Sequence, residues 1–306
     1  MKRVLVTGAG GFIGRQTLSP LQSAGYEIHA ASLTIPAEAP SGICWYTSNL
    51  LNAAEIEALC QTVRPTHLLH LAWYAEPGKF WNAPQNDQWL EAGQTLVEAF
   101  FRNGGRRAVF AGTCAEYEMG HGQCIENQTP LRPATLYGAC KNKLHQFASA
   151  FAEQNDLSVA WGRVFHLYGS YEHPQRFVPA VIRSLLRGEE ARCTAGTQLR
   201  DFMHVRDVAA AFVALLQSPA EDAVNIASGQ PVQLADIALH IATYLGAEEL
   251  LNLGALPTPA GEPSALTASV ARLNHEVKWI PSISLERGLT ESIIWWEERL
   301  FDSGRM

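Results

Sequence analysis

The chain has 306 residues, of which 47% are hydrophobic, and its formal net charge is −7. This length is sufficient for one large domain or two unequal ones, and an acidic chain without a run of lysine and arginine argues against a nucleic-acid surface. No apolar run reaches the length of a membrane span, and the first residues read as a strand and not as a signal peptide. The six cysteines lack the spacing of a zinc site or a disulfide framework. We therefore expect a cytoplasmic protein with reduced thiols, no metal and no membrane partner.

The first predicted elements are a strand over residues 3–8 and a helix over residues 15–25, joined by the segment TGAGGFIG at 7–14. Glycines have no Cβ, so the backbone at Gly8, Gly11 and Gly14 can turn sharply and approach a diphosphate closely. The N-terminus of the following helix adds free N–H groups and a positive dipole end. This strand, turn and helix predict a dinucleotide-binding loop.

Strand-like and helix-like runs then alternate. Strands are expected at 27–32, 66–72, 107–113 and 157–165, and helices at 53–63 and 88–104. Alternation of this kind predicts parallel strands with helices on both faces. After about residue 170 the segments become mixed, with proline and glycine between them. We expect an α/β protein with a doubly wound parallel sheet over residues 1–169, to which a segment near 200–228 returns, and a smaller mixed lobe over 170–306.

Two further signals suggest proton-transfer chemistry. Tyr137 and Lys141, in YGACK, are four residues apart and share one face of a predicted helix. An ammonium one turn away would lower the pKa of the phenol, which could then exchange a proton with a carbonyl oxygen near neutral pH. Thr113 ends a predicted strand, where its hydroxyl could hold the same oxygen or be an ordinary strand-end group. Taken alone, the tyrosine and lysine spacing is a frequent accident.

Together these motifs resemble, nearly end to end, the extended short-chain dehydrogenase/reductase family of nucleotide-sugar epimerases, dehydratases and ketoreductases. The resemblance rests on six signals in the family's order: TGAGGFIG at 7–14, HLAW at 70–73, Thr113 four residues before Tyr117, LRPATLYGACK at 131–141, RVFHLYG at 163–169 and GTQLRDFMHVRDVA at 196–209. It implies a Rossmann domain that binds NAD(P), with a substrate-binding lobe after it.

The resemblance also implies roles for individual residues. Tyr137 would be the acid/base, Lys141 would bind the nicotinamide ribose and tune Tyr137, and Thr113 would position the carbonyl. The cofactor-binding residues implied are Gly8, Gly11, Phe12, Ile13, Gly14, Arg15, Ser32, Asn49, Leu50, Leu71, Ala72, Trp73, Tyr137 and Lys141.

The end of the second strand bears on the choice of cofactor. NAD-binding folds usually place Asp or Glu there to hold the ribose hydroxyls, and this chain has Ser32. No carboxylate would repel a 2′-phosphate, and Arg15 lies on the adjoining helix. We therefore expect NADP, with NAD as the alternative.

The implied substrate is a nucleoside-diphosphate sugar. Arg200, in RDFMHVRD, matches the family's diphosphate-binding arginine, whose fork of donors suits phosphate oxygens. The other substrate-binding residues expected are Trp73, Thr113, His166 and Arg176. Two differences from the family's pattern indicate that the substrate is bound differently. His166 stands where many relatives have Asn, and the second phosphate arginine expected near TPAGEP is missing.

The residues after Thr113 bear on the reaction. The 4,6-dehydratases carry Asp-Glu there, and this chain has Cys114 and Ala115, so 4,6-dehydration is not expected. We expect reduction of a nucleoside-diphosphate 4-keto-6-deoxy sugar, as in the abequose synthase type. The alternative is an epimerase or a bifunctional epimerase-reductase similar to GDP-fucose synthase, with Cys114 and His173 as the second acid/base pair.

Two readings outside this class remain open: a silent cofactor-binding regulator and a reductase of a non-nucleotide carbonyl compound. Relatives dimerise through helices that correspond here to about 86–103 and 135–155, so a homodimer is implied.

Overall fold

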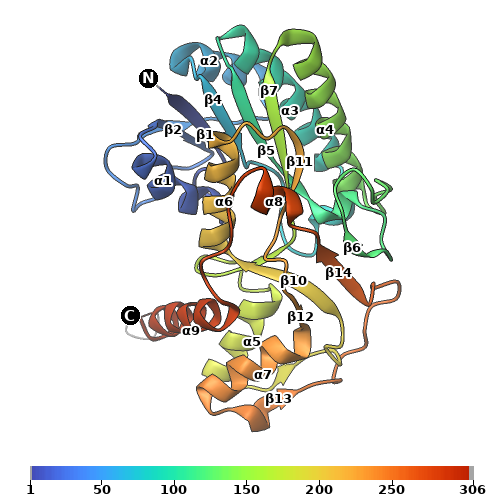
Figure 1. The fold of residues 1–306 in the computed structure, drawn as a ribbon. Helices are drawn as coiled ribbons and strands as arrows, with labels where there is room; N and C mark the ends of the chain where they lie inside the picture. Colours follow the sequence, from blue (N-terminus) through green and yellow to red (C-terminus); the bar gives the residue numbers. More distant parts are fainter. Residues whose placement is uncertain (1, 303–306) are drawn as a thin grey trace.

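The computed structural model describes residues 2–302. They form two main sheets, each packed against its own set of helices (Figure 1). The larger sheet is parallel and seven-stranded, in the order β11-β7-β5-β4-β1-β2-β3. Its strands are β1 (Arg3–Thr7), β2 (Glu27–Ser32), β3 (Cys44–Thr47), β4 (His67–His70), β5 (Arg107–Thr113), β7 (Ser158–Val164) and β11 (Asp222–Ile226). The expected doubly wound parallel sheet is confirmed.

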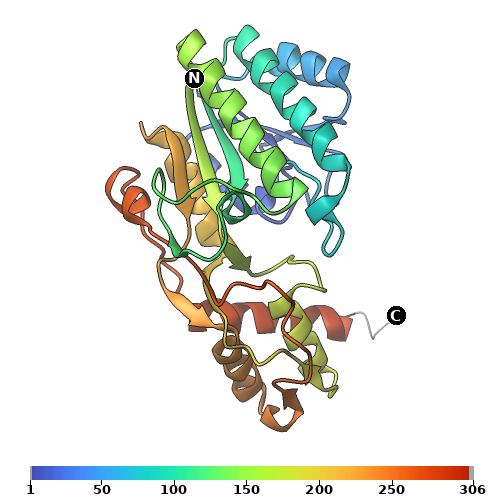
Figure 2. The same cartoon turned by 90° about the vertical axis from the view of Figure 1, so that its right-hand side faces the viewer.

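Helices cover both faces of this sheet because successive side chains of its strands, which point to opposite faces, are apolar. In β1, Val4 and Val6 pack on one side and Leu5 packs on the other. The first side is covered by α1 (Gly14–Ser23) and α6 (Val205–Gln217). The second side is covered by α2 (Ala53–Val63), α3 (Gln85–Arg102) and α4 (Leu136–Asn155), which run side by side in Figure 2.

The second sheet is mixed and lies below the first in Figure 1. Its order is β12-β10-β14-β6, with β8 paired to β10. Its strands are β6 (Gly122–Cys124), β8 (His166–Tyr168), β10 (Leu199–His204), β12 (Pro231–Gln233) and β14 (Ala265–Ala268). A two-stranded pair, β9 (Ala191–Arg192) and β13 (Leu251–Asn252), lies farther out.

Three helices form a separate apolar cluster in this lobe: α5 (Phe177–Leu186), α7 (Leu234–Leu245) and α9 (Leu285–Asp302). Short helical segments complete the chain: η1 (Phe80–Asn82), η2 (Cys114–Glu116), η3 (Glu248–Leu250) and α8 (Ala271–His275). The smaller mixed lobe is therefore as expected. Of the segment near 200–228, β10 lies in the second sheet, whereas α6 and β11 belong to the first.

Candidate active site

The glycine-rich turn forms a close cradle between β1 and α1. Gly8 has φ +69°, and a Cβ on it would lie 2.8 Å from the backbone nitrogen of Ala72. A Cβ on Gly14 would lie 2.1 Å from the carbonyl oxygen of Gly8. Among the described residues, no side chain caps the N-terminus of α1, which begins at Gly14. The site fits a dinucleotide diphosphate, because only glycines permit this approach and the helix N-terminus supplies donors.

Ser32 and Arg15 both approach Gly10 in this turn. A Cβ on Gly10 would lie 2.8 Å from Oγ of Ser32. Nη2 of Arg15 donates to the carbonyl oxygen of Gly10 at 2.8 Å, and the guanidinium lies 4.0 Å from the centroid of the Tyr171 ring. A neutral hydroxyl and a fixed cation therefore stand together at the end of β2.

The other expected cofactor residues follow the carboxyl ends of neighbouring strands, where ligands of open parallel sheets bind. Asn49 is exposed, and its Oδ1 accepts from the N–H of Leu51 at 3.1 Å, whereas Leu50 is buried. Leu71 donates its N–H to Thr7 O at 3.1 Å. Phe12, Ile13 and Ala72 are partly buried in the segments that flank the cradle.

Thr113 and Tyr137 are brought together from β5 and α4. Thr113 is the last residue of β5, and its Oγ1 accepts from the N–H of Ala115 at 3.2 Å. Tyr137 lies in the first turn of α4, whose N-terminus is capped by Thr135. Burial raises the pKa of the Tyr137 phenol above its usual value of 10, and a side-chain hydrogen bond with Thr113 opposes that effect. The hydroxyls of Thr113 and Tyr137 therefore form a single polar group among apolar side chains.

Aromatic rings enclose the Tyr137 phenol. Its ring meets Phe80 edge to face at 4.9 Å between centroids, Trp81 at 6.0 Å and Trp73 at 6.4 Å. Trp73 is held in turn by its Nε1, which donates to Oδ1 of the buried Asn86 at 2.9 Å. The enclosure leaves Tyr137 partly buried, and the raised pKa keeps the phenol protonated at neutral pH.

Lys141 is 3% exposed one turn along α4. Its Nζ donates to the carbonyl oxygen of Ala111 at 2.7 Å and lies 3.9 Å from the centroid of the Trp73 ring. Burial lowers the pKa of Lys141 from 10.5 to about 7, while the negative charge of Glu116 raises it. The sequence predicted that Lys141 would lower the pKa of Tyr137; in the structure burial dominates and the phenol pKa is raised instead.

Two arginines, Arg176 and Arg200, form a cationic group near the aromatic enclosure. The guanidinium of Arg176 is 5.4 Å from the centroid of Phe80. Nδ1 of His166 is buried without a partner, and burial, followed by the charges of Arg200 and Arg176, lowers the pKa of His166 to about 3. The structure therefore places a neutral His166 within electrostatic reach of two arginines, and one of them, through Phe80, adjoins Tyr137.

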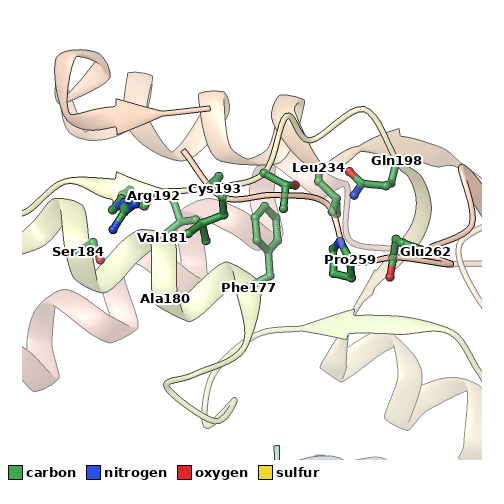
Figure 3. Close-up of a pocket in the computed structure, with 13 residues that line it drawn as sticks. Phe177, Ala180, Val181, Ser184, Arg192, Cys193, Gln198, Leu234, Pro259 and Glu262 are labelled. Carbon is green, nitrogen blue, oxygen red and sulfur yellow. The ribbon is translucent and has the colours of Figure 1, made fainter. Parts of the chain in front are cut away.

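Arg200 is 2% exposed and already has an acidic partner. Its Nη2 donates to the carboxylate of Glu262 and to the carbonyl oxygen of Pro263 at 3.0 Å. Glu262 also lines a cavity of about 310 Å³. Figure 3 shows the ring of Phe177 in this cavity, between Val181 and Cys193 on one side and Pro259 and Glu262 on the other.

The proposed second acid/base pair has a different setting. The thiol of Cys114 packs in the small cluster around Tyr117, and burial raises its pKa to about 12. His173 is exposed, and its Nδ1 accepts from the N–H of Gln175 at 3.2 Å. Cys114 therefore adjoins Thr113, whereas His173 belongs to the exposed loop before α5.

Sequence reasoning overlooked Glu116 and Glu262, which contact the candidate site through Thr113 and Arg200. Their only sequence signal was their proximity to motifs already recognised. Phe80 and Trp81 also adjoin Tyr137, and sequence alone cannot separate core packing from a site wall for such aromatic residues. Within residues 2–302, no helix is long and apolar enough to cross a bilayer, and no group of three potential ligands is arranged for a metal ion.

The comparisons with known proteins agree with this geometry. The model of the NAD dependent epimerase/dehydratase family matches residues 4–227. CDP-abequose synthase of Salmonella muenchen is 25% identical over 309 residues, covering 95% of this chain and 97% of that protein. The solved structure of MoeE5 in complex with UDP-glucose and NAD is 30% identical, with 97% and 99% of the two chains covered and a TM-score of 0.82. UDP-glucose 4-epimerase of Thermotoga maritima shares the fold, with a TM-score of 0.86 at 21% identity over 97% of this chain and 99% of its own. The chain belongs to the NAD dependent epimerase/dehydratase family.

Proposed function

We propose that this protein reduces the 4-keto group of a nucleoside-diphosphate 4-keto-6-deoxy sugar. A reduced nicotinamide cofactor supplies the hydride to the carbonyl carbon when it is bound. Tyr137 donates its proton to the carbonyl oxygen, and the hydroxyl of Thr113 holds that oxygen in line. Lys141 would bind the ribose next to the nicotinamide. Its positive charge would offset the negative charge that remains on the phenol after Tyr137 loses its proton.

The observation that carries the proposal is the setting of Tyr137. Its phenol shares a hydrogen bond with Thr113, is partly buried, and is surrounded by Trp73, Phe80 and Trp81. A phenol whose pKa is raised keeps its proton until a developing alkoxide takes it, which suits reduction. Apolar rings at this point also suit a sugar that lacks its 6-hydroxyl.

The cationic group and the cavity support a nucleotide-linked substrate. The charges of Arg176 and Arg200 both reach His166, and two guanidiniums match a diphosphate. The cavity of about 310 Å³ next to Arg200 has the size expected for part of a small-molecule site. We assign it to the nucleoside. The similarity to CDP-abequose synthase supports this class of substrate.

For the cofactor we propose NADP, with NAD as the alternative. Ser32 leaves the end of β2 without a carboxylate, and Arg15 is held by its hydrogen bond to Gly10, which packs against Ser32. The similar MoeE5 binds NAD, so the choice depends on this local difference.

Further parts of the proposal concern organisation. We propose residues 1–169 as the NAD(P)-binding domain and 170–306 as mainly the substrate-binding lobe. We propose a cytoplasmic homodimer paired through α3 and α4, because these helices carry partly buried rings on adjoining surfaces, with Phe101 and Phe151 at 5.6 Å between centroids and Phe147 beside them.

A second candidate is 4-epimerisation of a nucleotide sugar with the cofactor retained. It is favoured by the 24% identity to UDP-glucose 4-epimerase of Streptomyces lividans over 92% of both chains. In that case the Tyr137 phenol would return to its starting protonation state within one turnover, and no cofactor would be consumed.

The two candidates are separated by one assay. Purified protein is mixed with NADPH or NADH and a panel of CDP-, dTDP-, GDP- and UDP-linked 4-keto-6-deoxy sugars, and absorbance at 340 nm is followed. Stoichiometric oxidation with one of them supports the reductase. Interconversion of nucleoside-diphosphate hexoses without net oxidation supports the epimerase, and turnover of neither kind argues against both.

A further inference from the structure

Glu116 is a buried carboxylate directly behind Thr113. Its Oε1 accepts a hydrogen bond from the backbone N–H of Thr113 at 2.8 Å and another from Nε1 of Trp161 at 2.9 Å. Its Oε2 accepts from Nε of Arg163 at 2.7 Å. The side chains of Glu116 and Arg163 are 0% and 2% exposed. A carboxylate with three such donors, sealed from water, is held in one position.

The backbone around Glu116 is shaped for this contact. A Cβ on Gly112 would lie 2.0 Å from Nε1 of Trp161 and 2.7 Å from Oε1 of Glu116. A Cβ on Gly138 would lie 2.3 Å from the carbonyl oxygen of Ala115. Glycines at both places therefore let η2 pack against β5 and against the first turn of α4. The η2 segment therefore lies between Thr113 and Gly138, the neighbour of Tyr137, and Glu116 anchors η2.

We propose that Glu116 is a positioning residue of the candidate catalytic site, which fixes Thr113 and the turn beneath Tyr137 and presents its carboxylate charge to Tyr137 and Lys141. The proposal rests on the proposed function, in which Thr113, Tyr137 and Lys141 perform the reduction. It goes beyond that function because Glu116 would touch neither substrate nor cofactor.

The charge of Glu116 reaches both proposed catalytic side chains. Burial is the larger effect on both groups, raising the pKa of Tyr137 and lowering that of Lys141; the charge of Glu116 adds to the first shift and opposes the second. The other charged or titratable groups that face them are few: Cys114 and Arg176 face Tyr137, and His70 faces Lys141. Burial lowers the pKa of His70 to about 3, so His70 is neutral and brings no charge of its own.

Arg163 balances Glu116 from the opposite side. Its remaining nitrogens approach the hydroxyl of Tyr117 at 3.2 Å and Nδ1 of His145 at 3.4 Å. The pair is therefore neutral as a whole but oriented, with its anionic end toward Thr113. An oriented pair gives a field at the site without a net buried charge.

Two substitutions of Glu116 distinguish the position of its carboxylate from its charge. Glu116→Asp keeps the charge and the pairing with Arg163 but withdraws the carboxylate from the N–H of Thr113. Glu116→Gln keeps an oxygen for that N–H and for Trp161 but removes the charge. Arg163→Met is added to the Gln variant as a second version, because an unpaired buried guanidinium destabilises the fold and a neutral pair does not.

The matched control is Glu126→Gln. Glu126 is another buried carboxylate, 5% exposed, whose Oε1 accepts from the backbone N–H of Asn225 at 2.7 Å. Its partner is Asn225 in β11 and not Thr113. Thermal melting and NADPH binding are measured for every variant, so that folding is separated from activity.

Two readouts follow. The first is kcat and KM against pH with the active substrate from the panel above. The second needs no substrate: NMR titration of ε-¹³C-lysine, in which the chain's five lysines are resolved and Lys141 is assigned with Lys141→Met. Failure to turn over any substrate would refute the proposed function while the titration still tests the charge of Glu116.

We expect Glu116→Asp to lower kcat by about tenfold to a hundredfold, with little change in KM, because a small displacement of a positioned group has this effect. Lys141 should titrate as in the wild type. We expect Glu116→Gln, alone or with Arg163→Met, to move the Lys141 titration to lower pH and the alkaline limb of kcat with it. A folded Asp variant with unchanged kcat would overturn the positioning role, and a Gln variant with an unchanged Lys141 titration would overturn the charge. Loss of melting temperature alone, or equal losses in Glu126→Gln, would reduce Glu116 to a structural residue.

Discussion

Arg200 and Glu262, 62 residues apart in the chain, form an ion pair at the edge of the cavity of about 310 Å³ that we assign to the nucleoside. The guanidinium is almost fully buried, whereas the side chain of Glu262 is 33% exposed. An incoming diphosphate would therefore share or replace a carboxylate at Arg200. The segment TPAGEP lacks the second phosphate arginine that we expected there. It supplies instead an acidic residue, Glu262, which forms an ion pair with the arginine that remains, Arg200.

The first prediction concerns Arg200. Arg200→Ala should weaken binding of the nucleotide sugar about tenfold to two-hundredfold, because a charge-assisted hydrogen bond contributes about 1.5–3 kcal/mol. The loss should appear in KM, since the diphosphate lies away from the reacting carbon. Arg200→Lys should recover part of it. Titration calorimetry with the nucleoside diphosphate and steady-state kinetics measure both effects; unchanged binding would remove Arg200 from the site.

The second prediction concerns the proton donor. Tyr137→Phe keeps the ring in its aromatic enclosure and removes only the hydroxyl. Turnover should fall by about 10² to 10⁴, the range for a positioned acid/base, while NADPH binding stays the same. Rapid-mixing absorbance at 340 nm with the active substrate is the measurement. Near wild-type turnover would show that another group supplies the proton.

The third prediction concerns the cofactor. Ser32→Asp would place a carboxylate where the 2′-phosphate of NADP is proposed to lie, next to Gly10. Repulsion should shift the preference from NADP to NAD. Dissociation constants for both cofactors, in the wild type and the variant, give the comparison. A wild-type protein that prefers NAD contradicts the NADP assignment directly.

The fourth prediction follows from the depressed pKa of Lys141, about 7 in the folded chain against 10.5 ordinarily. Below about pH 7 the lysine is charged in both states, and the cost of burying that charge is fully present. Between the two pKa values the unfolded state binds more protons, so the free energy of unfolding contributed by this residue rises with pH. Lys141→Met should therefore be more stable than the wild type near pH 6, with the difference shrinking toward pH 10. Urea unfolding across that range tests the sign, and a difference independent of pH would show that Lys141 is not buried as a cation.

Much of the architecture was available from the sequence. The strands that lead into motifs, such as β1 before the glycine-rich turn and β5 before Thr113, are fully or nearly fully buried and read as short apolar runs. The strand β3 was missed because its four residues are exposed or partly buried at the edge of the sheet, so they show neither an apolar run nor alternation.

The candidate site was predictable where one motif contains the chemistry and was not where distant segments meet. Tyr137 and Lys141 share a helix, so their proximity follows from spacing alone. Their pKa values depend instead on burial, to which Phe80 and Trp73 contribute from a different part of the chain. Spacing predicted a lowered phenol pKa, and tertiary burial reversed the direction.

The last strand of the large sheet has a consequence for how the chain is made. β11 pairs with β7 over five residues, from Asp222 with Ala160 to Ile226 with Val164. A nascent chain that has reached only residue 169 therefore has β7 as an open edge, with unpaired N–H and C=O groups along a buried, apolar strand. Such an edge is a template for another chain. Expression of residues 1–169 alone should give aggregates, and during synthesis this edge stays exposed until some sixty further residues have emerged.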